Sequence, residues 1–336
     1  STMLGILGGA VPPFKALLFF IKELEFFILY FYVFSAIKTP KAVEAVLTTW
    51  LIATALNLAW IIIQLVTPIH FLGYYYGPSL FSEPQNPFAT GTVLLIIALF
   101  FLNLLLFYYL PKTRSRIKKT LLSILIISPA VGIFGSGSVA AAIAFFATVP
   151  ILLCLYILKA QKFKANILPV VVIVIVAVLF IGLNKLDIYG AQRQFHALDK
   201  IKGELSLDKP GSRISIWSDY IGRTFASPLA PFIGYGKSKF GETHNQFIRV
   251  FTETGIIGLF AFLVLVFALL KKAGIEFLTR REPLVVGFAG GLFTTTLAML
   301  IVSIPAESFI YSIKISETFW FFTGVAMATF HLKSYA

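Results

Sequence analysis

The stretch THNQFIRVFTETGIIGLFAFLVLVFALLKK, residues 243–272, decides the fold class of this chain. From residue 246 to residue 270 it is predominantly apolar, and it then ends at Lys271 and Lys272. A run of this kind is typical of a transmembrane helix, which needs about 20 largely apolar residues. His244 therefore lies where the chain enters the membrane.

The composition of the whole chain also indicates a membrane protein. Of its 336 residues 58% are hydrophobic and only 13% are charged, and the mean hydropathy is +0.89. A soluble domain cannot bury that much apolar surface. The 35 Phe and 13 Tyr fit lipid-facing helices with aromatic side chains at the interfaces.

The net charge of +13 does not indicate a nucleic-acid partner. The Lys and Arg residues fall mainly in short runs between apolar segments, where they set topology or contact anionic lipid headgroups. Membrane lipids are therefore the expected partners, and nucleic acid is not. Cys154 is the only cysteine and lies in an apolar span, which excludes an internal disulfide and a cysteine metal site.

Apolar runs of spanning length recur along the sequence, about nine by the length criterion. They cover residues 14–37, 44–66, 89–110, 120–134, 138–158, 167–184, 246–270, 284–304 and 309–330. The first is the least regular, because Lys15, Lys22, Glu23 and Glu25 interrupt it. We therefore predict an all-α polytopic membrane protein, residues 1–336 forming one integral membrane domain with nine or more transmembrane helices.

The basic residues of the short loops predict the orientation. They occur at Lys38 and Lys41, at 112–119, at Lys159, Lys162 and Lys164, and at Lys271, Lys272, Arg280 and Arg281. By the positive-inside rule these loops are cytoplasmic. Residues 67–88, the Gly135–Ser138 turn, 185–245 and 304–310 then lie outside. The N-terminus also falls outside, and we expect further helices on the N-terminal side.

Residues 185–245 form the one outer segment that is too long for a simple connection, and long loops are usually functional or disordered. Ser212–Phe225 carries apolar residues in approximate helical periodicity, which predicts a short helix. Aromatic side chains are expected to anchor the loop at the membrane surface: Trp217, Tyr220, Phe225, Phe232, Tyr235 and Phe240. We expect this loop to carry the active site.

His244 allows two interpretations. A neutral imidazole can accept a proton from a hydroxyl, so His is the commonest general base. Alternatively, His244 is an interfacial residue that, with Asn245, caps the following helix. Glu253 is expected to be a buried partner for an arginine or an orienting group. Gly255 and Gly258, three residues apart, predict close helix packing.

Three arginines are expected on the same outer face: Arg193, Arg213 and Arg223. A guanidinium binds phosphate oxygens in a bidentate manner, which suits a lipid-linked diphosphate held at the headgroup level. The alternative is general contact with lipid headgroups. His196 has no such context, and we expect it at the surface. The loop has no closely spaced carboxylate pair of the kind that holds a divalent metal.

An ordered set of motifs here resembles the O-antigen ligase family, which includes lipopolysaccharide O-antigen ligases and related O-antigen polymerases. The motifs are Gly211–Trp217 with its arginine, the turn Pro231–Gly236, His244-Asn245, and Gly255-x-x-Gly258. The outer segment Phe81–Ala89 is also similar to the family. The resemblance spans about residues 70–270, and the ordered set is more specific than any one motif.

The chain departs from the family pattern at two positions. Trp217 stands where the family often has Leu, and Val139 follows Ser138 where the family commonly has Arg. A phosphate-binding arginine is therefore absent from that position, and Lys15 or Arg193 is expected to replace it.

The resemblance implies a GT-C-like fold and a glycosyltransferase of the bacterial inner membrane whose active site faces the periplasm. The donor would be a glycan on undecaprenyl diphosphate, and the acceptor a sugar hydroxyl of lipid A-core or, in a polymerase, a second lipid-linked repeat unit. Transfer would invert the anomeric carbon, with no cofactor or metal. His244 would be the general base, and Arg213 would stabilise the departing diphosphate. Substrate-binding residues would be Arg193, Arg223, Lys15, Asn86, Asn245, Tyr235 and Glu253.

A transporter or flippase for lipid-linked sugars is a competing function. It would be expected to carry polar or charged side chains along the midpoints of its helices. The spans 89–110, 120–134, 138–158 and 167–184 hold almost none, so the sequence favours transfer over transport.

Overall fold

The computed structural model of the chain describes residues 12–66, 87–163, 212–236 and 240–332. Within these ranges it contains helices and no strands, which confirms the all-α prediction for this part of the chain. The helices are α2 (Pro13–Ala36), α3 (Pro40–Val66), α4 (Pro87–Leu104), the π-helical turn η2 (Leu105–Tyr109), α5 (Leu110–Lys112), α6 (Arg116–Gly135), α7 (Val139–Phe163), α11 (Arg213–Phe225), α12 (Ala230–Ile233), α13 (Gln246–Thr279), α14 (Pro283–Val302) and α15 (Ile313–His331).

Among the described residues, six helices are long and apolar enough to cross a membrane. They contain residues 40–60, 88–112, 116–135, 139–159, 246–279 and 283–302, in agreement with six of the predicted spans. The predicted spans 14–37 and 309–330 correspond to α2 and α15, which are helical but are not among the six. Four charged residues interrupt α2, and two lie near the start of α15. The predicted span 167–184 lies outside the described residues.

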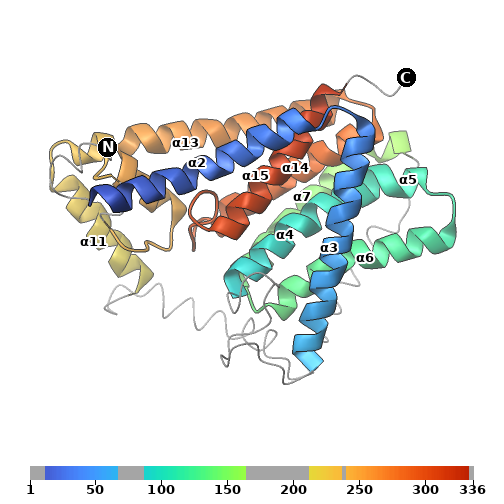
Figure 1. Cartoon of the computed structure of the whole chain (residues 1–336), viewed down its shortest axis with the longest axis horizontal. Coiled ribbons are helices and arrows are strands. Elements are labelled where there is room, and N and C mark those ends of the chain that lie inside the picture. Colours follow the sequence, from blue (N-terminus) through green and yellow to red (C-terminus); the bar gives the residue numbers. More distant parts are fainter. Residues whose placement is uncertain (1–11, 67–86, 164–211, 237–239, 333–336) are drawn as a thin grey trace.

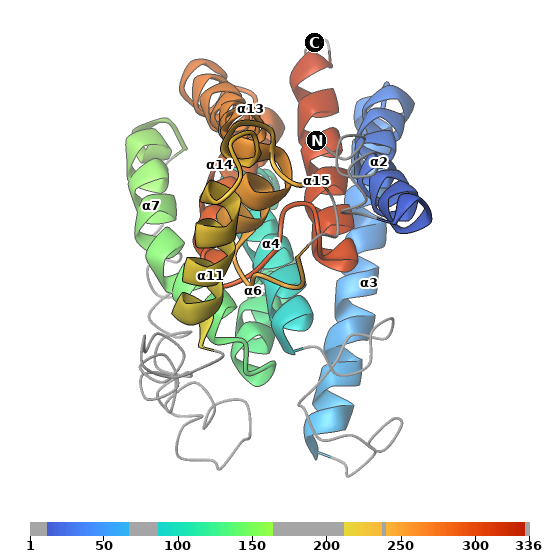
Figure 2. The ribbon, with the colours of Figure 1, turned by 90° about the vertical axis from the view of Figure 1, so that its left-hand side faces the viewer.

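The centre of the bundle is formed by α4 and α14. Nearly all of α4 and most of α14 are buried, and α14 packs against α4, α7, α13 and α15 (Figures 1 and 2). Gly290 and Gly291 of α14 leave no room for a Cβ atom beside Asn103 and Phe100 of α4. Small residues of this kind let transmembrane helices approach closely. Exposed apolar side chains on α2, α3 and α13 leave those helices with a surface suited to lipid.

Contacts between helix ends show that the basic loops gather at one end of the bundle. Lys112 at the end of α5 pairs with Glu44 near the start of α3, at 2.9 Å. Lys159 of α7 donates to the carbonyl of Arg280 after α13, at 3.2 Å, and Arg280 donates to the carbonyl of Phe330 in α15, at 3.1 Å. This arrangement agrees with the alternation of loops that the sequence predicts.

Helix α13 is broken at Gly255, whose backbone has φ 69° and ψ −171°. The break exposes carbonyl groups of the preceding turn, and Tyr235 N–H and Gly236 N–H donate to the carbonyls of Thr252 and Glu253, each at 2.9 Å. A Cβ on Gly255 would lie 2.2 Å from the backbone of Phe232. Gly255 therefore packs closely against α12, as the predicted close helix packing expects, and α13 itself is broken at this residue.

Candidate functional site

His244 projects from a tight turn, Thr243–Asn245, that precedes α13; we call this the His244 turn. In the described part of the chain His244 is the only residue other than glycine with a positive φ, at 52°. Such a conformation costs on the order of 1–3 kcal/mol and persists only where the surroundings impose it. The histidine itself is exposed, whereas Thr243 and Asn245 are buried.

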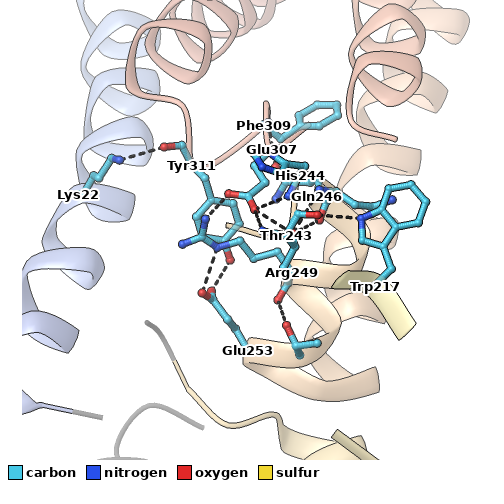
Figure 3. Close-up of polar contacts among 12 residues, drawn as sticks. Lys22, Trp217, Thr243, His244, Gln246, Arg249, Glu253, Glu307, Phe309 and Tyr311 are labelled. Carbon is cyan, nitrogen blue, oxygen red and sulfur yellow. Dashed lines mark hydrogen bonds and ion pairs between the residues drawn. The ribbon is translucent and has the colours of Figure 1, made fainter. Parts of the chain in front are cut away.

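The connection between α14 and α15, residues 303–312, lies against the His244 turn (Figure 3). Glu307 Oε1 accepts hydrogen bonds from Thr243 N–H at 2.7 Å and from His244 N–H at 3.2 Å. The Thr243 hydroxyl lies 2.8 Å from the same oxygen. One carboxylate oxygen of Glu307 therefore binds the N–H groups of both Thr243 and the strained residue His244.

The other oxygen of Glu307 pairs with Arg249, one turn into α13. Arg249 Nε also pairs with Glu253, at 3.1 Å, and the guanidinium lies 3.9 Å from the centre of the Tyr311 ring. Tyr311 in turn donates to Glu253, at 2.5 Å. We call these four residues the Arg249 network. Its charged side chains are at most 10% exposed, and buried charges of this kind need partners.

Arg213 and His244 meet the same connection. Arg213 is the first residue of α11, whose N-terminus is capped by Ser212, and it donates to the carbonyl of Pro305 at 2.6 Å. Pro305 is two residues from Glu307, which holds His244. The structure thus anchors the predicted base and the predicted leaving-group arginine to a single short segment.

The second turn of α11 also contacts the His244 turn directly. Trp217 donates from its indole N–H to the carbonyl of Thr243, at 2.8 Å (Figure 3). The loop aromatics Tyr220 and Tyr235 pack on Phe240. These residues hold the loop together, whereas Phe225 and Phe232 remain exposed and suit the predicted membrane-anchoring role.

Two predicted substrate-binding residues lie at the other end of α11. Arg223 follows Arg213 by ten residues, about 15 Å along a helix, and is exposed and paired with Asp219 at 2.9 Å. The Tyr235 hydroxyl donates to the carbonyl of Arg223 at 2.9 Å. Tyr235 thus joins the end of α11 to the following loop, and a contact of either residue with substrate stays a prediction.

Two further predicted residues are buried. Asn245 caps α13, its side-chain oxygen accepting from Phe247 N–H at 2.9 Å and Ile248 N–H at 3.0 Å, as one of the two interpretations expected. Glu253 is the buried partner of an arginine, and that arginine is Arg249. Gly258 lies within α13 beside the side chain of Thr254. Among the remaining predictions, Arg193, Asn86 and the side chain of Lys15 lie outside the described residues.

The sequence analysis missed Arg249, Glu307 and Tyr311. Arg249 and Glu253 are four residues apart near the start of an apolar span, a spacing that pairs charges on one helix face. Glu307 is a carboxylate in the short connection 303–312, which carries no basic residue. Those two signals were visible in the sequence. The contact between the connection and the His244 turn was not, because it joins residues 63 positions apart.

A comparison with known families matches part of the chain, and this part includes the His244 turn. A family described as O-antigen ligase matches residues 122–263, which include most of α6, all of α7, α11 and α12, the His244 turn and the first part of α13. A comparison with curated proteins finds no match. The family match over residues 122–263 supports the resemblance drawn from the motifs in that part of the chain.

Proposed function

We propose that this chain is a membrane glycosyltransferase that moves a glycan from undecaprenyl diphosphate to a sugar hydroxyl at the periplasmic face. The family match supports this class of reaction. The single observation that carries the proposal is the exposed histidine on a strained, firmly held turn at the membrane-entry end of α13. Strained positions of this kind cluster at functional sites.

His244 would act as the general base. As the acceptor hydroxyl attacks the anomeric carbon, the imidazole takes its proton, and the sugar–phosphate bond breaks with inversion. The leaving diphosphate is already a stable anion, so the reaction needs neither a general acid nor a metal. The exposure of His244 supports this role, because a hydroxyl on an incoming sugar can reach its ring.

Arg213 would stabilise charge on the leaving diphosphate. Its bond to Pro305 attaches the guanidinium to the segment that also holds His244. In the proposed reaction the base acts on the acceptor hydroxyl and the cation on the leaving diphosphate. A preorganised donor of this kind contributes about 3 kcal/mol to the transition state. Arg249 is a poorer candidate, because two carboxylates already pair with its guanidinium.

The base role is tested by His244→Ala and His244→Asn. Asn tolerates a positive φ better than other non-glycine residues, so His244→Asn keeps the turn while removing the base. We expect both variants to insert and fold normally and to lose transfer, measured with purified protein in lipid nanodiscs and a lipid-linked oligosaccharide donor.

Full activity in a folded His244→Asn protein would contradict the base role. The same assay in EDTA is expected to keep its rate, and a loss restored by added magnesium would contradict the metal-free reaction. Arg213→Lys tests the role of Arg213 at the leaving group, because it keeps the positive charge but loses the planar guanidinium with its paired donors.

The acceptor is decided by a separate comparison. Ligase and polymerase activities use the same donor and the same base and differ only in which hydroxyl attacks. We favour lipid A-core as acceptor, because the spacing of His244-Asn245 and Gly255-x-x-Gly258 resembles the ligases. The assay is run with and without lipid A-core; lengthening of the lipid-linked glycan in its absence favours a polymerase.

A further inference from the structure

The carboxylate of Glu307 makes several contacts at once with the His244 turn and with α13. It accepts from the N–H groups of Thr243 and His244, and its second oxygen pairs with Arg249. Its side chain is 10% exposed, so the carboxylate is held largely out of water. Charge-assisted hydrogen bonds to backbone N–H groups are among the stronger ones in proteins.

The segment that carries Glu307 is itself fixed to α13 on both sides. Gln246 N–H lies 3.0 Å from the carbonyls of Ser303 and Ala306, and Gln246 Oε1 accepts from Phe309 N–H at 3.2 Å. The Trp320 indole donates to the Phe309 carbonyl at 3.1 Å. The position of the carboxylate is therefore set by the fold before any substrate arrives.

Positively charged groups lie around Glu307. Arg249 faces two carboxylates, Glu253 and Glu307, which leaves a net charge of −1 on those three groups. Lys22 of α2 supplies a further positive charge close by, donating to the carbonyl of Tyr311 at 2.9 Å (Figure 3). The buried carboxylate of Glu307 is thus paired with an arginine and lies near a lysine, as buried charges require.

We infer that Glu307 is a positioning residue for the reaction: its carboxylate holds the His244 backbone at positive φ and so aims the imidazole at the acceptor hydroxyl. The orientation of the imidazole toward an acceptor hydroxyl rests on the proposed function. The hold of Glu307 on the His244 turn, which we call the clamp, does not depend on it. Glu307 does not touch substrate in this scheme and acts only through His244.

The test compares Glu307→Ala, Glu307→Gln and a control, Glu317→Gln. Glu317 is a carboxylate on α15 whose partner is Lys314, at 3.7 Å, and no described contact joins it to the His244 turn. Glu307→Gln keeps the length of the side chain and one carbonyl oxygen, so it remains informative even if Glu307→Ala does not fold.

Two readouts are needed. The first is kcat and KM for the lipid-linked donor, normalised to folded protein. The second is the imidazole signal of His244 in proton–carbon NMR of histidine-labelled protein, identified by its absence in His244→Asn. The second readout requires no activity, so it tests the clamp even if the proposed transfer reaction is wrong.

We expect Glu307→Ala to lower kcat about 100-fold, the usual effect of a misplacement near 1 Å, with KM nearly unchanged. Glu307→Gln should recover part of that loss, and Glu317→Gln should match the native protein. The His244 signal should shift and broaden in Glu307→Ala and not in Glu317→Gln.

Three results would overturn the inference. They are an unchanged His244 signal in Glu307→Ala, a kcat within twofold of native in that variant, or a rise in KM at constant kcat, which would make Glu307 a substrate-binding residue. If native protein shows no transfer but the His244 signal shifts in Glu307→Ala, the clamp stands and the proposed function fails.

Discussion

At the scale of single residues, the site depends on two backbone positions in the left-handed region, His244 and Gly255. His244 has φ 52° and is held there by Glu307. Gly255 has φ 69° and needs no such help, because it lacks a Cβ atom. The two positions have different roles. At His244 the turn exposes the imidazole, and at Gly255 the missing Cβ lets the backbone of Phe232 come close.

The substitution Gly255→Ala should destabilise the protein. A Cβ at this position would meet the backbone of Phe232 at 2.2 Å, and the positive φ adds strain. We expect a loss on the order of 1–3 kcal/mol or more, measured as a lower midpoint of thermal unfolding in detergent.

The matched control is Gly222→Ala in α11, where an added Cβ would have no neighbour within 4 Å. That substitution should leave stability unchanged or raise it by up to about 1 kcal/mol, because Ala favours the helix. Equal midpoints for the two variants would contradict the account of the break in α13.

At the scale of elements, α11 acts as a brace between the connection 303–312 and the His244 turn. Its first turns supply Arg213 and Trp217 to those two segments, and its last turn is joined to the loop by Tyr235. The two ends of one short helix thus have different tasks. The N-terminal end binds the two segments that form the site, and the C-terminal end attaches the helix to the loop that follows it.

This division predicts different effects for Trp217→Phe and Tyr235→Phe. Each removes one side-chain hydrogen bond to a backbone carbonyl, and each bond contributes about 1 kcal/mol. Trp217→Phe should lower kcat up to about fivefold, because the lost bond fixes the turn that carries His244.

Tyr235→Phe should leave kcat near its native value and instead make the segment around α11 easier to cleave in limited proteolysis. Both variants are compared in one preparation of each protein, with kinetics and proteolysis measured together. An equal loss of kcat in the two would argue against a special link between Trp217 and the site.

At the scale of the whole molecule, the bundle has two chemically distinct ends. Basic residues at the ends of α5, α7 and α13 gather at one of them. The His244 turn, Arg213 and the connection 303–312 gather at the other (Figures 1 and 3). The positive-inside rule then predicts that the basic end lies in the cytoplasm and the proposed site outside.

Single cysteines test this orientation in a Cys154→Ser background. Glu242→Cys and Arg281→Cys both introduce a thiol at an exposed position, one beside the His244 turn and one at the basic end. A membrane-impermeant maleimide should label the first in intact spheroplasts and the second only after permeabilisation. The reverse pattern would place the proposed site in the cytoplasm.

The sequence by itself determined the elements that local physics controls. Apolar runs of spanning length predicted the helices around α4, α13 and α14, and amphipathic periodicity predicted α11 close to its observed bounds. The motif around His244 was also visible, because its residues are close neighbours in the chain. Length, periodicity and spacing are properties of short segments and need no knowledge of packing.

Only the tertiary structure decided what surrounds the histidine. Glu307 reaches His244 across 63 positions and Arg213 reaches Pro305 across 92, through the packing of α13 against α14. The break at Gly255 likewise depends on the segment Phe232–Gly236 docking against α13. A buried carboxylate finds its partners only when helices far apart in sequence pack together, because no local pattern specifies which loop ends will meet.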